Sequence, residues 1–259
     1  MKTISVLAST VDYTVVGDGP GLVLAHGTSM TGQANFGHVV DRLADRWRVV
    51  VPDYAGSGAT VLPDGELTLD LAVAQLAAVI RDAGAGPVDL VGDSLGAMVA
   101  TATAARHPDL VRRLVLIAPW SDSSDPRHQL AFGLWARLLT DDPTLSNRFG
   151  LLMALSPGFA ATLTADMLAG FAAQDPPKDT ARRIHLDQHL DIRADASVIT
   201  APTLIIAGRN DYLVPEYQSR GLHDLIPGSR YESVTSGHAA LLEQPDAVIA
   251  LIRAFLLDS

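Results

Sequence analysis

The stretch VGDSLGAMVA, residues 91–100, holds a serine between two glycines at the end of an apolar run. Gly92 and Gly96 flank Ser94 in the pattern G-x-S-x-G, and the residues that follow have helical spacing. A sharp turn from strand to helix would expose the Ser94 hydroxyl. A serine hydroxyl is a weak nucleophile at neutral pH, so it needs a base, a group that orients the base, and donors for an oxyanion. Without these partners, the pattern indicates only a glycine-rich turn with a bystander serine.

The base and its orienting acid are expected further along the chain. His238 lies in ESVTSGHAALLEQP, in a small-residue loop after a short strand. Asp211 lies in PTLIIAGRNDYLVP, just past the end of another strand, while Asp122 and Asp125 are rival acids. The order Ser94, Asp211, His238 is one of the known orders of nucleophile, acid and base. We therefore predict that these three residues are catalytic, with ordinary loop positions as the alternative explanation.

The oxyanion donors are expected to be backbone N–H groups. One is the N–H of Leu95, the residue after the nucleophile. The other is expected in the loop after the early strand of LVLAHGTSMTG, where Thr28 is the first choice and Ser29 the second. His26 then has a structural role in shaping this loop.

The elements that must position these residues follow from the hydrophobic pattern. Apolar runs alternate with helical stretches, which predicts a mostly parallel α/β sheet flanked by helices. Strands are expected in YTVVGDGPGLVLAHG, WRVVVPDY, VDLVG, RRLVLIAPW, APTLIIAG and ESVTSG. Helices are expected in TLDLAVAQLAAVIRDAG, in residues 95–107 and in PDAVIALIRAFLL.

One segment, residues 121–200, interrupts this alternation and contains no convincing strand. It is rich in leucine, alanine, phenylalanine and methionine and is punctuated by prolines. We predict a helical cap, or lid, inserted after the strand that ends near Trp120, where open α/β sheets bind ligands. Residues 1–120 and 201–259 then form the core, and a plain extra helical layer is the alternative. The residues expected to contact substrate are Ser29, Trp120, Phe132, Trp135 and Met153.

The composition narrows the classes of partner. The 259-residue chain has a net charge of −10, and its arginines are scattered, so neither nucleic-acid nor membrane binding is expected. It has no cysteine, no apolar run as long as a membrane span, and a start, MKTISVLAST, unlike a signal peptide, which favours a cytoplasmic location. His185 and His189 lack an acidic partner at a zinc-motif spacing, so we expect no metal site. Serine-based chemistry needs no cofactor, and none is expected. The oligomeric state stays open, with a homodimer as one option.

With these motifs in place, the chain resembles the α/β-hydrolase superfamily over nearly its full length. The resemblance rests on LVLAHGTS, VVVPDYAGSG, LVGDSLGA, PTLIIAGRNDYLVP and SGHAALLEQP, which occur in this order at the usual spacing. It implies the α/β-hydrolase fold and the triad of Ser94, Asp211 and His238. It does not imply a substrate, because this fold hosts many chemistries.

Some branches of this superfamily fit the sequence poorly. Haloalkane dehalogenases and epoxide hydrolases of this fold have aspartate at the nucleophile position, which is Ser94 here. Asp93 matches the G-D-S-A-G-G motif of hormone-sensitive-lipase-like esterases, but HGTS departs from their H-G-G-G. The loop HGTSMTGQANF is similar to the oxyanion loop of serine hydrolases that cleave carbon–carbon bonds of vinylogous diketones.

The motifs and the resemblance together predict a serine hydrolase that cleaves an ester, thioester or lactone of a largely apolar small molecule through an acyl-enzyme. Carbon–carbon bond hydrolysis is one alternative, and acyl transfer or cyclisation in natural-product biosynthesis is another. A non-catalytic small-molecule receptor on the same fold is the alternative outside enzymes. An arginine or asparagine that lines the pocket and holds a substrate carboxylate would support carbon–carbon cleavage, and the candidates are Asn35, Arg127, Arg137, Asn147 and Arg148.

Overall fold

The computed structural model describes residues 1–84 and 86–258 and contains one eight-stranded sheet in the order β1-β2-β4-β3-β5-β6-β7-β8. Strands β3 to β8 are mutually parallel where they pair, while β1 and β2 are antiparallel to each other and β2 is antiparallel to β4. The predicted α/β-hydrolase fold, with a mostly parallel sheet flanked by helices, is therefore confirmed. The strands are β1 Lys2–Val6, β2 Ser9–Val16, β3 Gly21–Ala25, β4 Arg48–Asp53, β5 Val88–Asp93, β6 Val111–Ile117, β7 Thr203–Gly208 and β8 Arg230–Val234.

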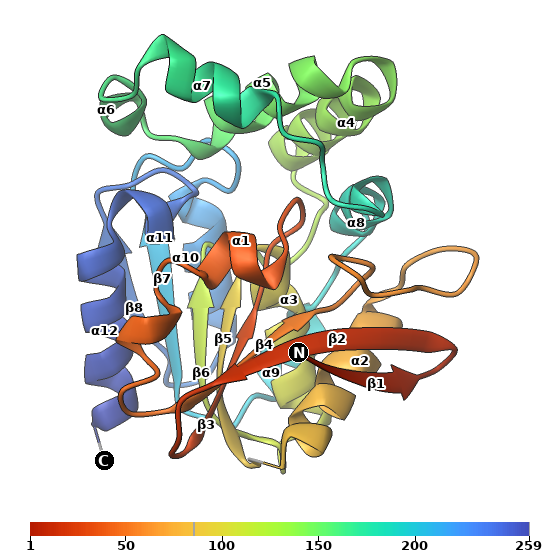
Figure 1. Ribbon diagram of the computed structural model, residues 1–259. Helices are drawn as coiled ribbons and strands as arrows, with labels where there is room; N and C mark the ends of the chain where they lie inside the picture. Colours follow the sequence, from red (N-terminus) through yellow and green to blue (C-terminus); the bar gives the residue numbers. More distant parts are fainter. Residues whose placement is uncertain (85, 259) are drawn as a thin grey trace.

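Helices cover both faces of the sheet (Figure 1). On one face lie α2 (Leu69–Ala83), α3 (Leu95–Arg106), α9 (Arg193–Ser197) and α10 (Glu216–Leu225), while the other face carries α1 (Gly32–Phe36), the 3₁₀ helix Val40–Arg42, α11 (Ala240–Glu243) and α12 (Pro245–Leu257). Successive β5 residues face opposite sides, because Leu90 belongs to the first core and Val91 to the second.

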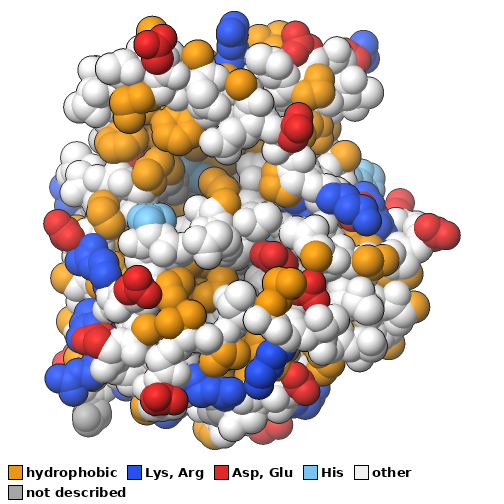
Figure 2. Space-filling model, viewed as in Figure 1, with side chains coloured by type: hydrophobic (Ala, Val, Ile, Leu, Met, Phe, Trp, Pro, Cys, Tyr) orange, Lys and Arg blue, Asp and Glu red, His pale blue; other side chains and the backbone are white. Residues whose placement is uncertain are grey.

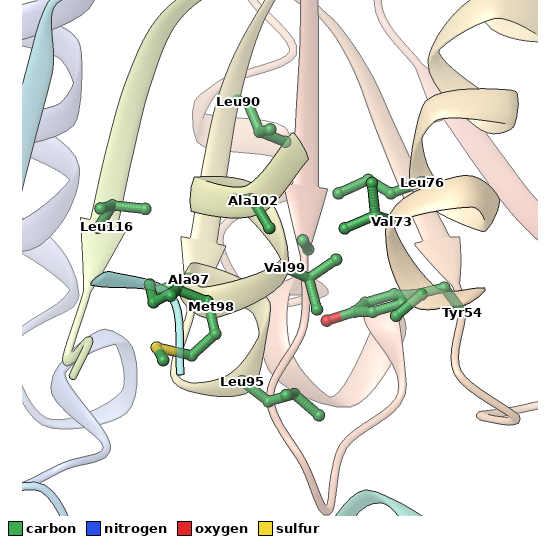
Figure 3. Close-up of a cluster of buried hydrophobic side chains, with 14 of the residues drawn as sticks. Tyr54, Val73, Leu76, Leu90, Leu95, Ala97, Met98, Val99, Ala102 and Leu116 are labelled. Carbon is green, nitrogen blue, oxygen red and sulfur yellow. The ribbon is translucent and has the colours of Figure 1, made fainter. Parts of the chain in front are cut away.

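The core under α3 fixes the helix that follows the serine. Figure 3 shows Met98 and Val99 of α3 among strand residues and the α2 residues Val73 and Leu76. Every α3 residue from Leu95 to Ala104 is buried. A helix that is buried on all sides cannot shift without opening the core, so the start of α3 is a rigid support.

Residues 126–187 form five consecutive helices without a strand: α4 (Pro126–Asp141), α5 (Pro143–Ala154), α6 (Pro157–Ala160), α7 (Ala165–Ala172) and α8 (Thr180–Asp187). We call them the inserted helices. The first three begin with a cap followed by proline, because the side chains of Asp125, Asp142 and Ser156 each accept a hydrogen bond from a first-turn N–H. In Figure 1 they lie beyond one end of the sheet, the end at which the parallel strands finish.

Two differences from the sequence prediction have simple causes. The strand predicted to end near Trp120 ends at Ile117, because Ala118 takes a positive φ of 48° and turns the chain. Strand β1 was not predicted, since it is an edge strand with a largely exposed and weakly apolar pattern, whereas the strand expected at YTVV is part of β2. No helix in the part of the chain that the structure describes is long and apolar enough to cross a membrane.

Candidate active site

Ser94 occupies the sharp turn between β5 and α3. Its φ of 54° and ψ of −120° lie in a region that side-chain-bearing residues rarely adopt, so the backbone here is strained. The glycines make the turn possible by close approach. A Cβ atom on Gly96 would lie 2.0 Å from the Ala25 carbonyl oxygen, and one on Gly92 would lie 2.3 Å from the Gly96 carbonyl oxygen. The G-x-S-x-G pattern therefore marks a position where only glycine fits on both sides of the serine.

A continuous hydrogen-bonded chain links the three residues predicted to be catalytic. The Ser94 hydroxyl lies 2.9 Å from Nε2 of His238, and Nδ1 of His238 lies 2.7 Å from Oδ2 of Asp211. The other carboxylate oxygen of Asp211 accepts from the N–H groups of Leu213 and Val214, at 2.8 Å each. Those two donors fix the carboxylate, which then orients the imidazole so that Nε2 can take the serine proton.

The two rival acids are engaged elsewhere. Asp122 binds Ser121 and Ser124, at the start of the inserted segment. Asp125 caps α4 and accepts from the Tyr217 hydroxyl. The histidine hydrogen bond is therefore made by Asp211, at the carboxyl end of β7.

Carboxyl groups dominate the electrostatics around His238. Burial lowers the pKa of His238, but the carboxylates of Asp211, Asp93 and Asp187 oppose it, and the net pKa is raised above 6.5. Burial also raises the pKa of Asp93, against the charge of His238 and a hydrogen bond from Asn35. Asp187 is buried deeply enough that its pKa rises to about 8.

The loop after β3 lies against the serine turn. A Cβ on Gly27 would meet the Ser94 Cβ at 3.2 Å. The side chain of Asn35 joins the two segments, since its oxygen accepts from the Gly27 N–H at 2.8 Å and its nitrogen donates to Asp93 at 2.8 Å. Across residues 1–84 and 86–258, no protein group accepts a hydrogen bond from the N–H of Thr28 or of Leu95, so both can serve a ligand oxygen.

His26 shapes this loop from within the core. It is fully buried, its Nδ1 donates to the Gly27 carbonyl at 2.9 Å, and its own carbonyl accepts from the Tyr54 hydroxyl at 2.8 Å. Burial, helped by the charge of Arg183, lowers the pKa of His26 to about 3. A neutral imidazole is therefore the stable form, which suits a structural role.

The residues predicted to contact substrate fall into two environments. The rings of Trp120, Phe132 and Trp135 form a row. The His128 ring stacks on the Phe132 ring, with 4.1 Å between the two ring centroids. All three are buried in the core cluster, whereas Ser29 and Met153 are only partly buried. Figure 2 shows a hollow between the inserted helices and the core, with hydrophobic side chains around it. Contact of the five residues with a substrate stays a prediction.

The sequence did not reveal a buried group on α8. Arg183 and Asp187, four residues apart on this helix, have fully buried side chains that reach Thr28. In the sequence this spacing is typical of an exposed ion pair on a helix surface, and no motif distinguishes it from one.

Comparison with known proteins identifies the family. The alpha/beta hydrolase fold family matches residues 20–245, and the chain belongs to this family. Pyrrolizixenacetamide deacetylase of Xenorhabdus hominickii is 37% identical over 262 residues, covering 100% of this chain and 98% of the relative. The 2-hydroxy-6-oxo-2,4-heptadienoate hydrolase of Pseudomonas putida is 31% identical, covering 93% of this chain and 90% of the relative.

Solved structures agree on the fold. An alpha/beta hydrolase enzyme from a Medee basin deep-sea metagenome library aligns with a TM-score of 0.90 at 20% identity, covering 100% of this chain and 98% of the other. Since the named relatives are hydrolases of this family, the protein is an enzyme of the α/β hydrolase class.

Proposed function

We propose that the protein is a serine hydrolase that removes an acyl group from an ester, thioester, lactone or amide of a largely apolar small molecule. The observation that carries this proposal is the hydrogen-bonded chain from Ser94 through His238 to Asp211. Amides join the substrates expected from the sequence because a relative with 37% identity is named a deacetylase of an acetamide.

In this mechanism, the Ser94 oxygen forms a bond to the substrate carbonyl carbon while His238 takes the hydroxyl proton. The N–H groups of Thr28 and Leu95 stabilise the oxyanion, and each such donor contributes roughly 3 kcal/mol in comparable sites. The tetrahedral intermediate collapses to an acyl-enzyme, and His238 gives its proton to the departing alcohol, thiol or amine. Water then repeats the sequence on the acyl-enzyme and releases the acid.

The inserted helices act in this proposal as the cap over residues 1–120 and 201–259. The segment Ala154–Ser156 supports it, because the Ala154 carbonyl accepts from the Ala239 N–H at 3.1 Å, beside His238. Such a cap would let a hydroxyl or amine of a bound molecule replace water as acceptor, which gives acyl transfer or cyclisation.

Carbon–carbon cleavage is the second candidate, since a relative with 31% identity is named a dienoate hydrolase. Three of the five candidate carboxylate-binding residues are engaged elsewhere. Both ends of the Asn35 amide are engaged by Gly27 and Asp93, and Asn147 donates to the carbonyls of Ala172 and Gln174. Arg137 pairs with Asp141 on an exposed face. The carboxyl groups around His238 also disfavour a negatively charged substrate.

The test is hydrolysis of 4-nitrophenyl acetate, butyrate and octanoate by wild-type protein and Ser94→Ala. We expect turnover by the wild type and a loss of roughly 10⁴-fold or more in the variant. A fluorophosphonate probe should label the wild type at Ser94, as located by peptide mass spectrometry. A folded wild type with neither turnover nor labelling would contradict the proposal and favour the receptor alternative.

A further inference from the structure

Thr28 is held from the side of the inserted helices by two residues of α8. Its hydroxyl donates to Oδ2 of Asp187 at 2.6 Å, and its carbonyl accepts from Nε of Arg183. All three side chains are buried, with exposures of 4% for Thr28 and 0% for Arg183 and Asp187. The residue that carries a predicted oxyanion donor is therefore fixed through both its side chain and its backbone carbonyl.

The same helix is tied to a second core loop. Arg183 Nη1 donates to the Ala55 carbonyl at 2.8 Å, in the loop that follows β4. Arg183 and Asp187 are four residues apart, so they lie on one face of α8, and this face is directed at the core. An arginine that binds two separate backbone carbonyls fixes the distance between the loops that contain them.

The far end of α8 is anchored within the inserted segment. The Asp187 carbonyl accepts from the Ser123 hydroxyl at 2.6 Å and from Nε2 of His128, on α4, at 3.0 Å. The placement of Asp187 thus depends on residues at the start of the insertion, and the core strands do not set it alone.

We propose that α8 is a clamp that positions the Thr28 N–H for the oxyanion, with Asp187 and Arg183 as positioning residues. This inference rests on the proposed function. An oxyanion donor is effective only at a hydrogen-bond distance from the developing charge, and a misplacement of about 1 Å can cost on the order of 100-fold in rate. The clamp adds two hydrogen bonds at Thr28 itself to the one by which Asn35 holds Gly27.

A purely structural role for the same contacts makes a different prediction. Loss of a structural hydrogen bond lowers the free energy of unfolding but leaves kcat of the folded molecules unchanged. Loss of a positioning contact lowers kcat and weakens binding of tetrahedral adducts, while KM changes little, because the ground-state substrate uses the donor less than the transition state does.

The decisive variants are Thr28→Val and Asp187→Leu, with Thr28→Ser and Asp187→Asn as conservative partners. Valine has the shape of threonine but no hydroxyl, whereas serine keeps the donor and asparagine keeps an acceptor oxygen. Thr103→Val is the matched control, since Thr103 is also buried and its hydroxyl donates to a backbone carbonyl, that of Val99, at 2.7 Å inside α3.

For 4-nitrophenyl acetate we expect kcat to fall about 10- to 100-fold in Thr28→Val and Asp187→Leu, with KM within about threefold of wild type. The inhibition constant of phenylboronic acid, which forms a tetrahedral adduct on serine, should rise by a similar factor. Thr28→Ser and Asp187→Asn should stay within about threefold of wild type, and the double variant Thr28→Val/Asp187→Leu should be no slower than the slower single variant. Thr103→Val should keep wild-type kcat.

Several outcomes overturn the clamp. One is a folded Thr28→Val variant that keeps the kcat and the boronate affinity of the wild type. If Asp187→Leu does not fold, the result for Thr28→Val is by itself the test of the clamp. Another is additive losses in the double variant, which would mean that the two side chains act separately. These results leave the proposed function intact as long as Ser94→Ala is inactive, whereas an active Ser94→Ala would remove the proposed function itself and the clamp with it.

Discussion

At the scale of single residues, the proposed mechanism depends on the protonation of His238. It must be neutral to accept the serine proton, and three carboxyl groups favour its charged form. The raised pKa makes His238 a stronger base than a free histidine, but it also keeps His238 protonated up to a higher pH. Activity as a function of pH should report this balance.

We expect kcat/KM for 4-nitrophenyl acetate to fall with decreasing pH, with a midpoint above 6.5, the ordinary value for histidine. The sign follows from the raised pKa, because below the midpoint Nε2 carries a proton and cannot take another. Asp93→Asn should move the midpoint to lower pH, since it removes a carboxylate that raises the His238 pKa but keeps an acceptor for Asn35. Asp122→Asn is the control, and an equal shift in both variants would contradict the assignment.

Single residues also show why the residues of the candidate triad could be predicted and those of the proposed clamp could not. Ser94 and Asp211 follow the strongly apolar strands β5 and β7, and His238 lies in a small-residue loop after the short, partly exposed β8, so chain order and local context identify the three residues. Arg183 and Asp187 lie on a short helix whose burial depends on packing against loops more than 120 residues away in the chain, with separations of 155 and 159 to Thr28. Such contacts leave no local pattern in the sequence.

At the scale of elements, β5 leads to the candidate nucleophile at one end and carries a buried ion cluster at the other. Asp89, near its start, is fully buried and binds the guanidinium groups of Arg112 and Arg113 on β6, with distances of 2.7 to 3.2 Å. Ser94 follows its last residue. The ion cluster therefore ties β5 to β6 at the end of the strands opposite Ser94.

Asp89→Ala is expected to lower the free energy of unfolding by about 2–4 kcal/mol, because it leaves two arginines without their buried partner. This loss of stability is near the lower end of the range for breaking a buried ion pair, because the side chains of Arg112 and Arg113 are 37% and 19% exposed and water can reach them. Urea unfolding measures the change, and kcat/KM should stay at the wild-type value. Arg137→Ala, which breaks an exposed pair with Asp141, is the control and should change neither quantity.

The alternation of strands and helices made most elements predictable, and the exceptions have physical reasons. The helix predicted over residues 95–107 is α3, Leu95–Arg106, and the helix predicted to stop near Gly84 ends at Ala83, with Gly84 in the left-handed conformation. The prolines of residues 126, 143 and 157 were treated as punctuation, and they mark helix starts. The packing of these helices on the core could not be predicted, because weakly amphipathic segments fit several orientations.

At the scale of the whole molecule, we expect charge to limit which substrates the proposed enzyme accepts. The chain carries a net charge of −10, and the carboxylates of Asp93 and Asp211 raise the pKa of the same buried histidine, whereas Asp187, with a pKa of about 8, is mostly uncharged at neutral pH. The long-range field of the protein and the charges beside His238 therefore both favour a cationic ligand over an anionic one. A cationic or neutral molecule can approach, whereas a carboxylate must overcome the field of the protein and then lose its water next to like charges.

Three acetate esters separate these contributions: acetylcholine, its neutral isostere 3,3-dimethylbutyl acetate, and the anionic 4-acetoxybutanoate. We expect kcat/KM to decrease in that order at low salt, with about a tenfold difference between cation and anion. Salt screens the long-range part, so 0.5 M NaCl should narrow the difference without removing it, since buried charges are screened less than exposed ones. Faster hydrolysis of the anion would mean that an arginine, such as Arg127, faces the substrate, and carbon–carbon cleavage of a carboxylate substrate would then become the better proposal.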